Sequence, residues 1–127
     1  MPENLLFEYA VIRIVPRVDR EEFLNAGVIL YCPKMKFLQI RFTVNEERVR
    51  AFCHKIDLGE LKDNLLAFEH ICAGKKDAGP IALLDLPSRF RWLTATRSTV
   101  LQSSKVHPGF TADPMETLNK LYQQLVL

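Results

Sequence analysis

The amino-acid sequence predicts an α+β fold with a small antiparallel or mixed sheet of three to four strands and helices packed on one face. Two observations support this class: segments with strand character are concentrated in the first third of the chain, and segments with helical periodicity follow them. The chain has 127 residues and is 48% hydrophobic, which is enough for a single domain over residues 1–127 with its own core. We therefore expect it to fold without a metal ion or a disulfide.

Three segments have the composition of β-strands. Residues 7–15, FEYAVIRIV, are rich in β-branched and aromatic side chains and stop at Pro16, which cannot donate to a sheet. Residues 27–32, GVILYC, are continuously apolar, so we expect both of these strands in the centre of the sheet. Residues 37–44, FLQIRFTV, alternate apolar and polar side chains, which is typical of a strand with one wet face. The PKMK turn before them predicts a hairpin with the preceding strand.

Capping residues and apolar stripes predict three helices later in the chain. Asn45 can cap a helix that begins with two glutamates, where the helix dipole favours negative charge. Asp57 can cap a second helix, which ends at Gly74. Asp113, followed by Pro114 at the first helical position, begins an amphipathic helix that closes the domain.

The segment from residue 86 to residue 112 contains no Asp or Glu. Within it we expect a short helix at residues 87–94, a strand at residues 99–103 and a turn at the HPG tripeptide. The RST tripeptide at residues 97–99 would combine a guanidinium group with hydroxyl and amide donors, a set that suits a phosphate or a carboxylate. The same groups often bind backbone carbonyls and helix ends, so a structural role is the alternative.

The candidate ligand- or partner-binding residues come from this acid-free segment and from the first strand. If the last strand lies beside the first, Arg13 and Arg97 would face one pocket. Histidine is a common general base, but no oriented acid or nucleophile lies near His107 in the sequence, so we assign no catalytic residue. The candidates are Arg13, Arg89, Arg91, Trp92, Arg97, Ser98, Thr99, Gln102, Ser103 and His107.

The composition argues against several classes of protein. The net charge of +2 is far from that of a dedicated nucleic-acid binder. The three cysteines are widely spaced and form no CxxC pair, so we expect buried free thiols, no metal and no cofactor. The acidic N-terminus does not have the form of a signal peptide, and no apolar run reaches the roughly 18 residues that span a bilayer. We expect a cytoplasmic protein.

Two blocks of the sequence carry a resemblance to a known family. Residues 9–33, YAVIRIVPRVDREEFLNAGVILYCP, and residues 89–122, RFRWLTATRSTVLQSSKVHPGFTADPMETLNKLY, resemble the bacterial domain-of-unknown-function family 3037. The resemblance implies a short bacterial protein without an established activity, and it carries over no catalytic residue. It also implies a protein partner, because members are often encoded beside a HipA-type serine/threonine kinase.

The chain departs from the family pattern in the first block. The resemblance implies RGE, with glycine after the arginine, where this chain has Arg20, Glu21 and Glu22. We expect the acidic replacement to alter that turn, in which Asp19 and Glu22 are spaced to cap a short helical turn reciprocally.

Two functions follow from these observations. The first is a noncatalytic accessory domain that recognises a protein partner, with a HipA-type kinase as the candidate. The second is binding of a small phosphorylated ligand or nucleic acid at residues 86–112, with hydrolytic activity as a minor variant. A partner surface should expose an apolar patch with Arg or aromatic anchors, whereas a ligand site should be concave with several converging donors.

Residues 27–32 would also allow a dimer that pairs edge to edge, if their strand is not central in the sheet.

Overall fold

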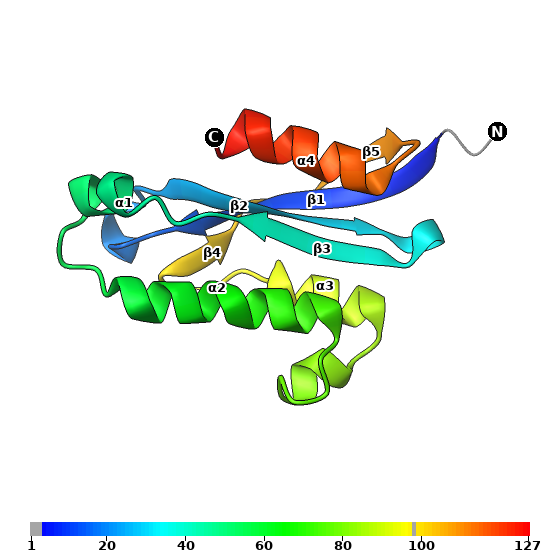
Figure 1. Ribbon diagram of the computed structural model, residues 1–127, viewed down its shortest axis with the longest axis horizontal. Coiled ribbons are helices and arrows are strands. Elements are labelled where there is room, and N and C mark those ends of the chain that lie inside the picture. The colour runs from blue at the N-terminus through cyan, green and yellow to red at the C-terminus, as the bar shows by residue number, and fades with distance from the viewer. Residues whose placement is uncertain (1–3, 98) are drawn as a thin grey trace.

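The computed structural model describes residues 4–97 and 99–127, and in these ranges it combines one sheet with four α-helices (Figure 1). The strands are β1 (Leu5–Ile14), β2 (Leu24–Cys32), β3 (Phe37–Phe42), β4 (Leu101–Ser103) and β5 (His107–Thr111). The α-helices are α1 (Glu46–Phe52), α2 (Leu58–Ala73), α3 (Leu86–Leu93) and α4 (Pro114–Leu125), and the 3-10 turns are η1 (Val18–Arg20), η2 (Pro33–Met35) and η3 (Pro80–Leu83). None of the helices in the described ranges is long and apolar enough to cross a membrane.

The α+β class is confirmed, but the sheet has five strands rather than three to four, and all of its pairings are antiparallel. The strand order is β3-β2-β1-β4, and β5 pairs with the N-terminal half of β1 while β4 pairs with its C-terminal end. β1 and β2 are therefore central, and β2 and β3 form a hairpin, both as predicted. Because β2 has a neighbour on each side, the edge-paired dimer through residues 27–32 is ruled out.

β5 is the strand that the sequence pattern missed. The HPG tripeptide at its start favours a turn, yet it pairs with residues 7–9 of β1. Pro108 is tolerated there because β5 lies at an edge of the sheet, where half of the backbone groups have no strand to bind. Pairing with the long β1 therefore overrides the local preference for a turn.

Helices cover both faces of the sheet, which corrects the prediction that they pack on one face (Figure 1). Ile12 and Ile14 of β1 point into a core that they share with α2 and α3. Phe7 of β1 and Leu30 of β2 point to the opposite face, where they pack against α4. The physical reason is that the two central strands are apolar on both faces, so each face needs its own cover.

The predicted caps begin the helices where the sequence placed them. Asn45, Asp57 and Asp113 each accept a hydrogen bond from a backbone N–H two or three residues later, at 3.0 to 3.1 Å. α2 ends at Gly74, whose φ of 68° lies in the left-handed region that favours glycine. α3 begins after Asp85, which caps it in the same way.

The turn after β1 differs from its prediction. Asp19 and Glu22 do not cap each other, because Glu21 between them has a left-handed φ of 55°. Asp19 instead forms an ion pair with Arg17, and Glu22 forms one with Arg20.

The three cysteines carry free thiols, and two of them are buried as expected. Cys32 and Cys72 are buried, whereas Cys53 is half-buried. Burial raises the pKa of the Cys72 thiol to about 12, so this thiol stays protonated and unreactive at neutral pH.

Candidate functional site

A groove of about 540 Å³ lies between α2 and the segment that leads from α3 into β4. We call it the Trp92 groove. Its lining is mostly apolar and includes Ala67, Phe68, Ile71, Trp92 and Val100, while Arg97 and, from α2, Glu60 and Asn64 are among its polar members. Thr99 also lines it, so three of the predicted site residues are brought together here.

Trp92 and Arg97 form one rim of this groove. The Trp92 side chain is 36% exposed, and its ring meets the ring of Phe68 edge-on, with 6.3 Å between centroids. The Arg97 guanidinium lies 4.5 Å from the Trp92 ring centroid and 5.6 Å from that of Phe68. Its Nη2 donates a hydrogen bond to the main-chain oxygen of Trp92. These contacts hold the Arg97 guanidinium close to two aromatic rings within the chain itself.

Partial burial lowers the pKa of Arg97 from its usual value. An arginine remains protonated at neutral pH even so, because its usual pKa is far above neutrality. The rim therefore presents a positive charge that is partly buried.

The hydroxyl and amide groups after Arg97 mostly bind their own backbone. Thr99 Oγ1 donates to the Leu101 oxygen at 2.7 Å, and Gln102 Nε2 donates to the Thr99 oxygen at 3.0 Å. Ser103 Oγ donates to the Ser104 oxygen at 2.8 Å. These bonds shape the segment into β4 and leave fewer donors directed into the groove.

Arg89 and Arg91, although on the same helix, are engaged away from the groove. Arg89 Nη1 donates to the Ile71 and Cys72 oxygens at the end of α2, at 3.0 Å in both cases. Arg91 forms a two-pronged ion pair with Glu8 of β1, at 2.7 and 3.1 Å, and this contact raises the pKa of Arg91. Both guanidinium groups thus join α3 to a neighbouring element.

Arg13 and Arg97 lie on opposite sides of the sheet, so they do not share a pocket. Arg13 is paired in register with Asn25, and Asn25 Nδ2 donates to the Leu125 oxygen of α4 at 2.9 Å. Paired residues point to the same face, so Arg13 faces the α4 side, where its guanidinium lies 4.0 Å from the Phe23 ring centroid. Arg97 contacts Phe68 of α2, on the other side.

Among the described residues, one further candidate, His107, lies outside the Trp92 groove. His107 is exposed in β5, with its ring 5.3 Å from that of Tyr9. Ser98 lies outside the described residues.

The comparison with protein families decides where this chain belongs. Residues 9–126 match the sequence model of a family described as "Protein of unknown function (DUF3037)". The chain belongs to the DUF3037 family. This agrees with the resemblance carried by the two sequence blocks, and the match covers nearly the whole chain. No curated protein and no solved structure matches the chain.

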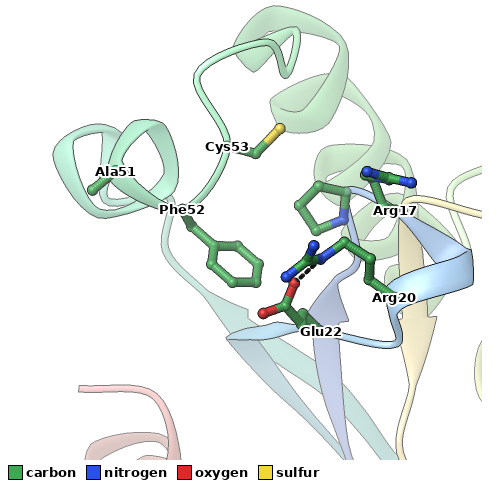
Figure 2. Close-up of a pocket in the computed structure, with 7 residues that line it drawn as sticks. Arg17, Arg20, Glu22, Ala51, Phe52 and Cys53 are labelled. Carbon is green, nitrogen blue, oxygen red and sulfur yellow. Dashed lines mark hydrogen bonds and ion pairs between the residues drawn. The ribbon is translucent and has the colours of Figure 1, made fainter.

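In this DUF3037 protein a second hollow, of about 360 Å³, lies between the β1–β2 connection and the end of α1 (Figure 2). Figure 2 shows the side chains of Arg17, Arg20, Phe52 and Cys53 around it. Both arginines are exposed and already form ion pairs with acidic neighbours in the turn, and the same pairs lower the pKa values of those carboxyl groups. This hollow therefore lacks an uncompensated charge, and it is the weaker candidate.

The part of the site that sequence reasoning missed is the α2 wall. Phe68 and Ile71 fall on the apolar stripe of α2 and look like ordinary core residues in the sequence. Nothing local indicates that this stripe also lines a groove with Arg97 and residues 99–101. Among the described residues, no group of three or more His, Cys, Asp or Glu side chains is placed to hold a metal ion.

Proposed function

We propose that this DUF3037 protein is a noncatalytic accessory module that recognises a protein partner in the Trp92 groove. The observation that carries the proposal is the exposure of Trp92 and Val100, at 36% and 37%, beside a mostly apolar groove. Exposed tryptophan and arginine beside an apolar hollow are the side chains that most often dominate the binding energy of protein interfaces.

The donors of the acid-free segment favour this function over a phosphorylated ligand or nucleic acid. A phosphate site needs several donors that converge on one point. Arg89 is bound to the end of α2 and Arg91 to Glu8, so of these three arginines Arg97 alone lines the groove. One arginine beside a largely apolar wall suits a protein side chain better than a phosphate group.

The groove also indicates the chemistry of its partner. Its apolar floor fits one or two large apolar side chains of the partner. Arg97 at the rim favours a partner with a carboxylate near these side chains. A HipA-type serine/threonine kinase is the first partner to test, because the family resemblance implies such a neighbour in the genome.

The test is isothermal titration of the purified chain with the HipA-type kinase encoded nearest to it. We expect binding, and we expect Trp92→Ala to weaken it by at least about tenfold, because a central aromatic anchor is lost. Met115→Ala is the matched control, since Met115 is an exposed apolar residue on α4, across the sheet from the groove. The control should bind as the unchanged chain does.

Equal losses in Trp92→Ala and Met115→Ala would contradict the groove as the binding surface. Absence of binding to the kinase, together with a rise in melting temperature on addition of nucleotides or inorganic phosphate, would favour the ligand function instead.

A further inference from the structure

The two edges of the sheet are protected very differently. One edge is formed by β4, which has three residues, and by β5, which contains Pro108. Short strands and proline are common means of preventing an edge from pairing with another chain. The opposite edge is β3, with six residues, FLQIRF, that contain no proline and no lysine and pair with β2 without a bulge. Among the described residues β3 pairs with β2 alone.

The hydrogen-bond pattern identifies which backbone groups of β3 point outward. Thr43 N donates to the Ala26 oxygen at 2.9 Å, in the same register as the β2–β3 pairs. Hydrogen-bonded and non-hydrogen-bonded pairs alternate along an antiparallel ladder, so residues 41, 39 and 37 direct their N–H and C=O groups toward β2. Leu38, Ile40 and Phe42 consequently direct theirs away from the sheet.

The side chains beside this edge leave it accessible. Arg41, the charged residue of β3, does not guard the edge, because its Nη1 donates to Asn119 of α4 at 2.7 Å and its guanidinium lies 4.5 Å from the Tyr122 ring centroid. On the α2 side a groove of about 290 Å³ runs along the edge, and Leu38, Ile40 and Cys72 are part of its lining. In Figure 1, β3 runs along the rim of the sheet between α4 and α2.

We propose that β3 pairs antiparallel with β3 of a second copy of this chain, forming a symmetric dimer with its twofold axis at Ile40. This register is the one in which all the outward groups of Leu38, Ile40 and Phe42 find partners. Ile40 exchanges two hydrogen bonds with its own copy, and Leu38 exchanges two with Phe42 of the second copy. A register centred on Gln39 would leave the groups of Phe42 unpaired.

The same register makes the strand complementary to itself. On the α2 side it places Leu38 opposite Phe42 of the second copy and Ile40 opposite Ile40, so apolar groups meet. On the α4 side it places Gln39 opposite Arg41 of the second copy, so a neutral amide lies beside each arginine while the guanidinium stays on α4. Glu69, which lines the groove, is the unfavourable element, because the axis brings its two copies toward each other. A second copy is thus the occupant whose sequence matches the edge.

The test measures the mass of the full chain by sedimentation equilibrium, from low-micromolar to near-millimolar concentration. We expect a reversible dimer with a dissociation constant of about micromolar order, because a single strand pairing buries a small area. Gln39 is exposed and its side chain is outside both cores, so it can be changed without unfolding the chain. Gln39→Lys should weaken the dimer about fivefold or more, because two like-charged pairs form, and Gln39→Glu should strengthen it by a similar factor.

Opposite responses of these two variants, at unchanged melting temperature of the monomer, would establish both the edge and the register. A chain that stays monomeric over the whole range would overturn the proposal. A dimer that responds to neither Gln39 variant would overturn it as well, because that dimer would use another surface. The kinase titration does not bear on this result, since the Trp92 groove lies beside β4, at the other edge.

Discussion

At the scale of single residues, Glu21, like Lys36, has a left-handed backbone conformation. Its φ of 55° places a residue with a Cβ in the left-handed region, which costs roughly 1 to 2 kcal/mol for most side chains. The strain is consistent with the glycine that the family resemblance implies at this position.

We therefore expect Glu21→Gly to stabilise the chain by about 0.5 to 1 kcal/mol, because glycine adopts this φ without strain. The gain is partly offset because glycine has more conformational freedom in the unfolded chain. Glu21→Ala is the matched control, because it removes the same carboxylate but keeps the Cβ and should give no such gain. Urea denaturation of the three proteins measures the difference. A gain from Glu21→Ala equal to that from Glu21→Gly would show that the charge, and not the backbone, is responsible.

Residue types alone could not separate the roles of the arginines. Arg89, Arg91 and Arg97 share one acid-free segment, and the sequence predicts the same donor chemistry for each. Their roles differ because Arg89 binds the end of α2, Arg91 binds a carboxylate of β1 and Arg97 contacts Phe68 of α2. Each of these partners comes from a distant part of the chain. The candidate site was thus predictable as a segment but not as a set of side chains.

At the scale of elements, the Arg89 side chain adds polar contacts to the apolar packing between α3 and α2. The Arg89 guanidinium donates to the Ile71 and Cys72 carbonyl groups at the end of α2, of which the Ile71 oxygen also accepts from Gly74 N at 3.1 Å. A positive charge there also suits the helix dipole. Gly74 follows directly, and a Cβ at that position would lie 2.7 Å from Arg89 Nη1, so both the left-handed φ and this close approach require glycine.

Arg89→Ala should lower the free energy of unfolding by about 2 to 3 kcal/mol, because two carbonyl groups lose a charged donor in a half-buried site. Arg91→Ala on the same helix should cost at most about 1 kcal/mol, since its ion pair with Glu8 is largely exposed. Thermal denaturation followed by circular dichroism compares the two. Equal costs would mean that Arg89 does not join the helices as described.

The elements were predicted where the local signal was strong. The caps at Asn45, Asp57 and Asp113 and the apolar runs of β1 and β2 place those elements within a few residues of their observed bounds. The sequence pattern did not predict β5, because this strand depends on pairing with a distant segment. β1 is long enough to pair with both β4 and β5 on one edge. Residues 107–111 contain no local signal for that pairing.

At the scale of the whole molecule, the central strands join two separate cores. The larger core lies between the sheet and α2 with α3, and the smaller one lies between the sheet and α4. β1 and β2 contribute alternate side chains to the two cores. If these strands unfold, the side chains of both cores become exposed to solvent. This arrangement predicts that the two layers unfold together even though the described residues form two separate apolar clusters.

Trp92 is the single tryptophan of the chain and lies on the α2 side, so its fluorescence reports on that layer alone. Leu118 of α4 is fully buried in the smaller core, and Leu118→Ala should cost about 2 to 5 kcal/mol by leaving a cavity there. If the layers are coupled, the urea midpoint followed by Trp92 fluorescence will fall as far as the midpoint followed by circular dichroism. Leu65→Ala, in the larger core, should shift both midpoints in the same way.

The opposite result would be a Leu118→Ala variant in which the circular dichroism midpoint falls and the Trp92 fluorescence midpoint does not. That result would mean that α4 unfolds on its own and that the Trp92 groove keeps its shape without α4.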